Sequence, residues 1–315
     1  MKRQIGLLAV AAVSGCAFVF FAPKQSQAKQ TTTSTSTSAT TKQFLRIDHD
    51  EQCRVIRVFR GDRETPILVE NAFDDTRPYI YPVVAPDGNG LITEFRPWHH
   101  PHQMGIFWGF KYINGRDYFM KWQGDYYRKV SAGVVAASGQ QVKWKTVYDM
   151  LDEKGNTIMT ETQNWSMSAP NSKYILDLDW EGDAKADLSI SKYYVGGLFI
   201  RMPWHPGVDA EALNSVGQQN QAAEAQRAKW VDMGIQVEGR DDLAHIAVCD
   251  SPGNVGFPVA WRVDSQFGFG PDRSWREWSM HKGQSEALRY RLLAYTGDFN
   301  TTEVNRVCAE SAGNK

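Results

Sequence analysis

Two stretches of alternating side chains on either side of a turn constrain the fold of this chain most. Residues 140–150 and 157–167 flank the loop Asp152–Asn156, whose Asp, Gly and Asn residues suit a β-hairpin. Side chains alternate between the two faces of a strand. One face of the first arm carries Val142, Trp144, Thr146 and Tyr148, and one face of the second carries Ile158, Thr160, Thr162 and Asn164. The pattern predicts a pair of long antiparallel strands.

Strand signals recur along the rest of the chain, and helix signals are few. Tyr174–Trp180 alternates apolar and acidic residues, as a half-buried strand does. Further strands are predicted at 53–60, 67–70, 187–194, 197–202, 243–249, 258–264 and 286–295. The Ala/Gln/Glu-rich stretch Gln218–Lys229 lacks an apolar stripe and is predicted to be a surface excursion.

One helix is predicted at the C-terminus. Asn300 can cap it with Glu303 three residues on, and Val304, Val307 and Cys308 would then face inward. Many strands in one body, with few short helices, predict an all-β fold. We expect a large antiparallel two-sheet β-sandwich that forms a single domain over residues 44–315.

The N-terminus has the pattern of a secretory signal. Lys2 and Arg3 precede an apolar run that extends to Ala22, and Ser-Gln-Ala at 26–28 fits a small-x-small cleavage site. We therefore expect a signal peptide over residues 1–28 and a protein in the periplasm or outside the cell. The Ser/Thr-rich residues 29–43 follow, and they are expected to form a disordered linker.

Two alternatives concern the same segment. Val-Ser-Gly-Cys at 13–16 resembles a lipobox, which would leave the protein lipid-anchored through Cys16. An uncleaved anchor is the other alternative, because an apolar run of about 18 residues can just span a bilayer. Contact with a membrane is expected only through such an N-terminal lipid or anchor.

The charge content argues against a nucleic-acid partner, and the cysteine spacing argues against a zinc site. The chain has 35 basic and 36 acidic residues, and cleavage after residue 28 would remove three basic ones. It has no basic tract, so we expect no nucleic-acid binding. Cys53, Cys249 and Cys308 would remain, which allows at most one disulfide among them, and no C-x-x-C spacing suggests zinc.

The stretch 96–110 concentrates candidate functional groups. It holds three of the seven histidines, at positions 99, 100 and 102, together with Trp98 and Trp108. In an extended chain, residues i and i+2 point to the same face, so His100 and His102 would converge and His99 would face away. Such a pair can divide acid and base roles. No cofactor is predicted, although a metal between His100 and His102 is an alternative that lacks a third ligand at a fixed spacing.

Arginines near this stretch are candidates for binding an anion. Arg77 and Arg96 precede the histidines, and Arg201 follows the double glycine Gly196-Gly197 ahead of a predicted strand. A guanidinium group can bind a carboxylate, a sulfate or sugar hydroxyls through a planar fork.

Familiar catalytic motifs are missing from the sequence. There is no phosphate-binding G-x-x-x-x-G-K-[ST], no G-x-S-x-G and no H-E-x-x-H. A glycosidase with paired carboxylates is compatible with the sequence, because such carboxylates have no fixed spacing. Glu94, Glu161, Asp232 and Asp250 are the candidates. Most of the eleven tryptophans are expected in the core, and a minority could stack on a saccharide.

From about Arg77 to Asp298, the chain resembles the PmoA-like family of bacterial β proteins, often labelled "methane oxygenase PmoA". The resemblance rests on Arg77-Pro78-Tyr79 with Tyr81-Pro82, His100-Pro101-His102, Gly105 with Trp108, Gly196-Gly197-Leu198 with Arg201, Trp230 with Asp232, Cys249–Asn254, Trp261, Leu288–Arg291 and Gly297-Asp298. The family's histidine loop usually reads His-Pro-His-His-Arg-Gly. Here Gln103 and Met104 replace its third imidazole and its arginine.

The resemblance implies a galactose-mutarotase-like β-sandwich and a carbohydrate substrate. His100 or His102 would then act as acid or base, with Arg77, Arg96 or Arg201 neutralising a carboxylate or a developing oxyanion. We expect the substrate to contact Tyr81, Trp98, Trp108, Trp230, Asp232, Asn254 and Trp261.

The leading functional prediction is therefore an exported protein that acts on a carbohydrate by hydrolysis, β-elimination or epimerisation. One alternative is a non-catalytic saccharide-binding module, which needs the aromatic side chains but no titrating group. A metal-dependent oxidoreductase, as the family label suggests, is the other alternative.

Overall fold

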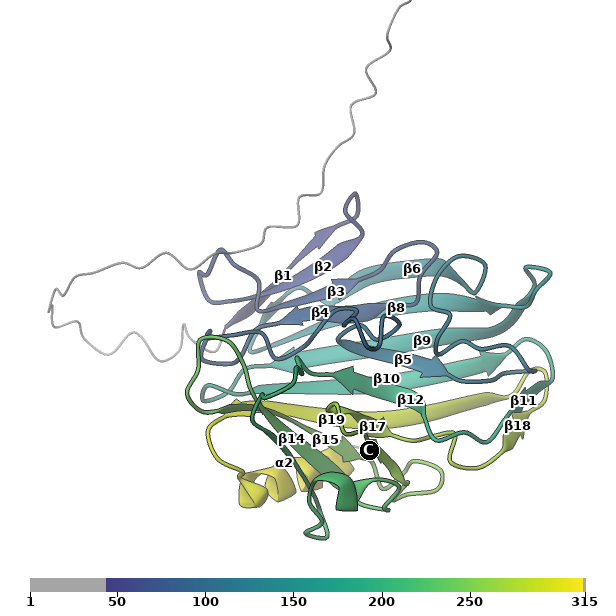
Figure 1. Ribbon diagram of the computed structural model, residues 1–315. Helices are drawn as coiled ribbons and strands as arrows, with labels where there is room; N and C mark the ends of the chain where they lie inside the picture. The colour runs from purple at the N-terminus through teal and green to yellow at the C-terminus, as the bar shows by residue number, and fades with distance from the viewer. Residues whose placement is uncertain (1–43, 314–315) are drawn as a thin grey trace, which may run out of the picture. The chain divides into compact units, whose positions relative to one another are not determined.

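A computed structural model describes residues 44–313, in which two large antiparallel sheets face each other (Figure 1). The predicted signal peptide, lipobox and linker lie outside these residues. The two-sheet sandwich predicted from the alternating pattern is confirmed. Within residues 44–313, helical structure is limited to one short 3-10 helix, η1 (Asn220–Ala223), and one α-helix, α2 (Thr301–Gly313). None of the described helices is both long and apolar enough to cross a bilayer.

The first sheet has nine strands in the order β16-β17-β12-β5-β4-β3-β2-β1-β7. Their bounds are β1 (Leu45–Asp50), β2 (Val55–Arg60), β3 (Leu68–Asn71), β4 (Tyr79–Val83), β5 (Ile106–Phe110), β7 (Ser138–Gly139), β12 (Gly196–Arg201), β16 (Trp261–Val263) and β17 (Gly268–Pro271). Strands β5 and β12 are neighbours although 85 residues separate their ends, from 110 to 196. This pairing brings the histidine-rich stretch beside Arg201.

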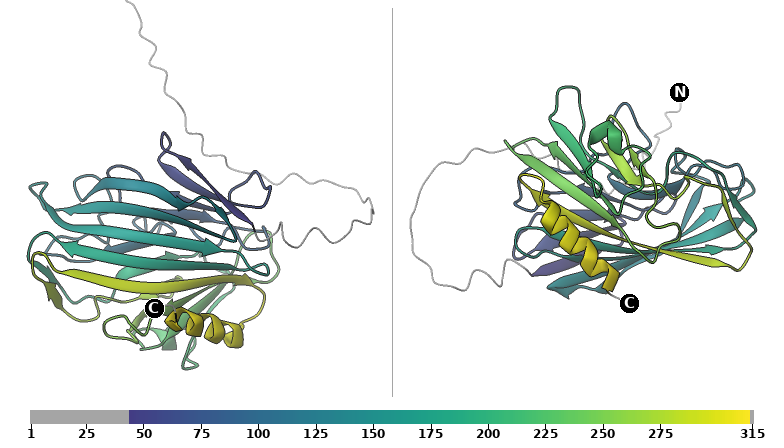
Figure 2. Two further views of the ribbon diagram at one scale, coloured as in Figure 1. Left: turned by 180° about the vertical axis from the view of Figure 1, so that it is seen from behind. Right: turned by 90° about the horizontal axis from the view of Figure 1, so that it is seen from below.

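The second sheet has eight strands in the order β13-β14-β15-β19-β10-β9-β8-β6 (Figure 2). Their bounds are β6 (Tyr127–Ala136), β8 (Gln141–Leu151), β9 (Thr157–Ser168), β10 (Tyr174–Ala184), β13 (Ala210–Asn214), β14 (Trp230–Gln236), β15 (Leu243–Asp250) and β19 (Ser285–Thr296). A small third sheet pairs β11 (Leu188–Ile190) with β18 (Trp278–Met280). The predicted hairpin is β8–β9, and its first arm buries Val142, Trp144, Thr146 and Tyr148 as one face.

The main core lies between the two sheets. Trp108 on β5 stacks on Trp180 of β10 with ring centroids 4.3 Å apart, so the two layers contact each other directly through aromatic rings. Both rings are about 1% exposed. Large aromatic side chains fill the space between two sheets and bury much apolar area.

The C-terminal helix covers part of the outer face of the eight-stranded sheet (Figure 2). The predicted cap is confirmed, because the Glu303 backbone N–H donates to Oδ1 of Asn300 at 3.0 Å. Val304 and Val307 are fully buried. Cys308 forms a disulfide with Cys249 of β15, which attaches the helix to the sheet.

Candidate functional site

The histidines lie on a hairpin-like excursion between β4 and β5. The Gly105 N–H donates to the Glu94 carbonyl at 2.7 Å, and the Arg96 N–H donates to the Gln103 carbonyl at 2.8 Å. The Arg201 N–H donates to the Gly105 carbonyl at 2.8 Å, so the base of the excursion is bonded to β12. We call residues 94–105 the histidine hairpin.

Three imidazoles gather at the tip of the histidine hairpin. Nδ1 of His99 lies 2.7 Å from Nδ1 of His100, and the rings of His100 and His102 have centroids 5.7 Å apart. The prediction that His100 and His102 lie together is confirmed, but the prediction that His99 faces away is wrong. The tip consists of turns, with the His100 N–H bonded to the Pro97 carbonyl at 3.0 Å, and the i, i+2 rule holds only for extended chain.

Burial and neighbouring cations keep these imidazoles neutral. Burial, followed by the charge of Arg201, lowers the pKa of both His99 and His100 below the ordinary value. Burial, followed by the charge of Arg77, lowers the pKa of His102 to about 3. A neutral imidazole has one ring nitrogen with a lone pair that can accept a proton. The contact between Nδ1 of His99 and Nδ1 of His100 holds a single hydrogen, so one of the two nitrogens donates and the other accepts. At neutral pH these imidazoles can therefore accept a proton.

Arg77 lies beneath the cluster and supports it. This fully buried side chain donates from Nη2 to the His102 carbonyl and from Nη1 to the Phe119 carbonyl at 2.8 Å. Its guanidinium carbon lies 3.9 Å from the centroid of the Phe107 ring. The neighbouring strand β5 has a glycine, Gly109, next to this side chain. The glycine leaves room for the guanidinium group, because an added Cβ would lie only 3.0 Å from Nη1 of Arg77. Arg77 thus positions the hairpin tip without contacting solvent.

Arg201 is the second buried arginine and connects three segments. It donates to the Gln103 side chain, to the Gln266 carbonyl, and to Oδ2 of Asp264 at 3.3 Å. The contact with Asp264 is a buried ion pair. The Arg201 guanidinium group is bonded to the histidine hairpin through Gln103. Its positive charge is therefore close enough to lower the pKa values of His99 and His100.

Glu94 supplies a carboxyl group at the base of the histidine hairpin. Burial raises the pKa of Glu94, while the charges of Arg201 and His205 oppose this shift. Its Oε2 is buried and has no hydrogen-bond partner in the described structure. A carboxyl group with a raised pKa holds its proton closer to neutral pH and can act as an acid. Glu94 was one of four carboxylates named from the sequence.

Aromatic rings flank the cluster on the solvent side. Trp98 is 80% exposed, and its ring meets His99 edge-on with centroids 5.3 Å apart. Trp204 contacts His99 in the same way at 5.3 Å. Arg96 is exposed, donates from Nε to the Pro101 carbonyl at 3.1 Å, and lies over the Trp122 ring. An exposed tryptophan beside imidazoles offers a stacking surface for a sugar ring.

The other predicted contact residues do not join this cluster. Tyr81 is half-buried and stacks on Phe95 at 5.4 Å, next to the hairpin. Trp108 and Trp261 are buried in the main core. Trp230 and Asp232 lie under α2 on the other sheet, where Asp232 accepts a hydrogen bond from the Tyr295 hydroxyl and contacts Nδ1 of His245 at 3.3 Å.

The remaining predicted polar residues have structural partners. Asn254 donates to Asp250 at 2.8 Å and to the Arg289 carbonyl at 2.7 Å, and so joins the loop after β15 to β19. Glu161 is buried between the sheets, where burial raises its pKa to about 7, and it accepts a hydrogen bond from Gln163 at 2.7 Å.

Sequence reasoning missed three residues near the cluster, one on β16, one directly after it and one before β12. Arg262, Asp264 and Tyr194 were not singled out, and no motif marks them. They reach the cluster through the pairing order β5-β12-β17-β16, which no local pattern encodes. No group of three or more His, Cys, Asp or Glu side chains suited to a metal ion occurs in the described part of the chain.

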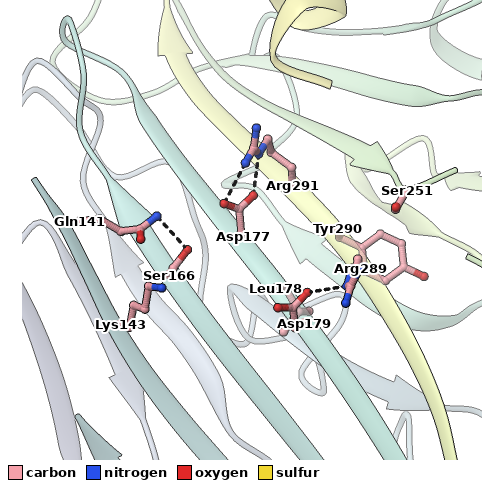
Figure 3. Close-up of a pocket in the computed structure, with 10 residues that line it drawn as sticks. All are labelled: Gln141, Lys143, Ser166, Asp177, Leu178, Asp179, Ser251, Arg289, Tyr290 and Arg291. Atoms are coloured by element: carbon pink, nitrogen blue, oxygen red, sulfur yellow. Dashed lines mark hydrogen bonds and ion pairs between the residues drawn. The ribbon is translucent and has the colours of Figure 1, made fainter. Parts of the chain in front are cut away.

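A separate groove of about 320 Å³ lies on the eight-stranded sheet (Figure 3). Its charged side chains are paired across strands: Arg291 binds Asp177 at 2.6 and 3.0 Å, and Arg289 binds Asp179 at 3.1 Å. Such cross-strand pairs are a usual way to stabilise the polar face of a sheet. The groove has no imidazole, so we place the candidate site at the histidine hairpin.

Comparison with known proteins gives a family match. Residues 63–309 match the model of DUF6807, described as a family of unknown function. The search of curated proteins gave no match.

Solved structures give distant matches. One is galactose 1-epimerase from Lactobacillus acidophilus, with 7% identity and a TM-score of 0.39, which covers 81% of this chain and 98% of that one. Another is the GH36 α-galactosidase AgaB from Geobacillus stearothermophilus, with 8% identity and a TM-score of 0.40, which covers 80% of this chain. This chain spans 41% of the length of that enzyme.

Proposed function

The chain belongs to DUF6807, a family of unknown function, and we propose that it acts on a carbohydrate by transferring protons between the sugar, Glu94 and the imidazoles of the histidine hairpin. The observation that carries this proposal is that a carboxyl group of raised pKa, Glu94, and imidazoles of lowered pKa lie within electrostatic range of the same buried arginine, Arg201. Groups whose pKa values are shifted in opposite directions divide naturally into acid and base.

Trp98 supports a sugar as the substrate. Its ring is exposed next to His99, and sugar rings stack on aromatic faces while their hydroxyls bond to nearby polar groups. Arg96, at the same tip, is exposed and can donate to hydroxyl or carboxylate oxygens.

The proposed mechanism uses the directions of these pKa shifts. His100, which is neutral and paired with His99, accepts a proton from the sugar, and the Glu94 carboxyl, when it carries its proton, donates one to the oxygen that leaves the carbon atom. In epimerisation the proton comes from the anomeric hydroxyl and the ring oxygen receives one. In β-elimination the proton comes from carbon and the glycosidic oxygen receives one. Either reaction needs one acid and one base, which this cluster supplies.

Hydrolysis by two free carboxylates is supported less well. That mechanism needs a second carboxyl group on the other side of the scissile bond. Asp264 is in contact with Arg201, and its ion pair with the buried guanidinium makes it a positioning group.

The test is turnover of a sugar panel by Glu94→Gln and His100→Asn variants. Reducing sugars are followed by NMR for anomer exchange, and uronic-acid oligomers are followed by absorbance of the unsaturated product. We expect each variant to lose at least about a hundredfold in rate, the usual contribution of acid–base catalysis, with an unchanged melting temperature. His281→Asn is the control, since this side chain is 82% exposed and lies in the turn after β18. Full activity in both site variants would refute the proposal.

We also propose that the protein is exported. The disulfide between Cys249 and Cys308 supports this, because such bonds persist in oxidising compartments, as does the signal-like N-terminal pattern. Mass spectrometry of the protein from fractionated cells should give an N-terminus at Lys29 in the periplasm or medium. An unprocessed chain in the cytoplasm would contradict the proposed export.

A non-catalytic saccharide-binding module is the second candidate, and the exposure of Trp98 is the observation that favours it. Binding of a sugar without any product, unchanged between about pH 5 and 8 where histidine titrates, would select this candidate over the enzyme.

A further inference from the structure

We propose that the ligand is a saccharide of at least two rings, with one ring on Trp98 and another on Tyr194, and with the imidazoles of His99 and His100 between them. This inference rests on the proposed site at the histidine hairpin and specifies the length of its ligand.

Exposed aromatic rings are rare in the described part of the chain. Trp98 is 80% exposed and Tyr194 is 58% exposed, and Phe44, at 43%, is the third such ring among these residues. Phe44 immediately precedes β1, which lies four strands from β5. Leaving a large ring in water forfeits the free energy of burying it, so two such rings beside one cluster of polar groups indicate a binding surface.

Contacts extend from each of the two rings toward the cluster, and an electrostatic influence of Arg262 on His100 joins the two sets. Trp98 contacts His99, and His99 contacts His100, at centroid distances of 5.3 and 5.0 Å. Burial and Arg201 contribute most to the lowered pKa of His100, and the Arg262 guanidinium contributes as well, so Arg262 is within electrostatic range of this imidazole. Arg262 in turn lies 5.0 Å from the centroid of the Tyr194 ring.

Tyr194 is held in place before any ligand binds. Its ring stacks on Tyr193 with centroids 4.3 Å apart, and Tyr193 meets Tyr112 edge-on at 5.8 Å. Arg262 is fixed by an ion pair with Glu224, whose carboxylate also accepts a hydrogen bond from the Val263 N–H. A ring already ordered by its neighbours loses little conformational entropy when a sugar stacks on it.

The groups between the two rings suit the hydroxyls of a sugar chain. His100 is half-buried and offers its ring nitrogen Nε2, which is not the one bonded to His99, and Arg262 is a quarter exposed and offers N–H donors. Tyr194 precedes the first residue of β12, Gly196, whereas the histidine hairpin is bonded to the last, Arg201, so one ring stacked on Trp98 would leave Tyr194 uncovered. A second sugar ring would cover it.

The experiment is calorimetric titration of the whole protein. The probes are glucose, galactose and glucuronate, together with their 1,4-linked dimers and tetramers in both anomeric forms. We expect at least one dimer to bind about tenfold more tightly than its monomer, which is the effect of one added stacking contact. Trp98→Ala and Tyr194→Ala should each abolish this gain. Tyr194→Phe, which keeps the ring, should retain it, and Phe44→Ala should leave it unchanged.

The outcomes separate this inference from the proposed reaction. Equal affinity for monomers and longer chains, unchanged dimer binding by Tyr194→Ala, or no binding of any probe would each overturn the two-ring ligand. Turnover of a monomer that depends on Glu94 but not on Tyr194 would support the proposed reaction and contradict the two-ring ligand. Binding that increases with chain length but gives no turnover would support the two-ring ligand and contradict the proposed reaction.

Discussion

Arg201 of β12 donates a hydrogen bond from Nε to the side-chain oxygen of Gln103 on the histidine hairpin. The two residues are 98 positions apart in the sequence and both are buried. This bond, together with the Arg201–Asp264 ion pair, fixes the hairpin against the nine-stranded sheet, and the charge of Arg201 adds to the effect of burial in lowering the pKa of His99 and His100.

Replacing Gly268 by alanine should disrupt this arrangement. An added Cβ would lie 2.3 Å from Nη2 of Arg201 and 2.8 Å from Oδ2 of Asp264, so the ion pair would have to move. We expect a loss of activity and a loss of about 1–3 kcal/mol in unfolding free energy, the usual cost of overpacking. Urea denaturation and the sugar assay measure both. Gly133→Ala is the control, since nothing lies within 4 Å of its added Cβ. Equal stability and equal activity of Gly268→Ala and Gly133→Ala would show that the space beside Gly268 does not constrain Arg201.

His102 should make stability depend on pH. Burial, followed by the Arg77 charge, lowers its pKa to about 3, whereas an unfolded histidine titrates near about 6.5. Between these values the unfolded chain binds the extra proton, so the contribution of His102 to stability is present above about pH 6.5 and is lost as the pH falls toward 3.

The measurement compares melting temperatures of the unmodified protein and His102→Gln from pH 7.5 to 4.5. Glutamine does not titrate, so the variant should gain stability relative to the unmodified protein as the solution is acidified. A constant difference across this range would mean that His102 is protonated equally in both states.

The disulfide should stabilise the protein without affecting the site. Cys249 and Cys308 are 59 positions apart in the sequence and attach α2 to the eight-stranded sheet, opposite the sheet that carries the histidine hairpin. A Cys249→Ala/Cys308→Ala double variant should lose about 2–4 kcal/mol of unfolding free energy, mainly because its unfolded chain is less restricted. Turnover at 25 °C should remain as in the unmodified protein. A loss of turnover in a fully folded double variant would show that the two faces are coupled.

Two neighbouring ion pairs in the polar groove should differ in strength (Figure 3). The Arg291 side chain is 10% exposed and forms two bonds with Asp177, whereas both side chains of the Arg289–Asp179 pair are more than 60% exposed. Asp177→Asn should cost about 1–3 kcal/mol because it leaves a nearly buried guanidinium group without its carboxylate. Asp179→Asn should cost less than about 0.5 kcal/mol. Chemical denaturation measures both, and similar losses would contradict the assigned difference in burial.

Local sequence patterns were sufficient to predict individual strands and the C-terminal helix, but not which of them contact one another. The β8–β9 hairpin and the Asn300 cap were predicted correctly because each depends on residues within one turn of each other. The orientation of His99 was predicted wrongly because the chain at Pro97–Gln103 folds into turns rather than a strand.

The composition of the site depends on long-range pairing. Glu94, Arg201 and Asp264 come together because β12 pairs with β5 on one side and with β17 on the other. A sequence pattern also does not distinguish a tryptophan in the core, such as Trp108, from an exposed one, such as Trp98. Both stand in the same 15-residue stretch from Arg96 to Phe110.

The most direct test of the proposed site is a crystal structure of the protein soaked with the tightest-binding oligosaccharide of the panel. We expect a sugar ring against Trp98, with its reacting atoms within hydrogen-bond distance of Glu94 and of the His99–His100 pair. A sugar bound instead in the groove beside Asp177 and Arg291, with the histidine hairpin unliganded, would contradict it.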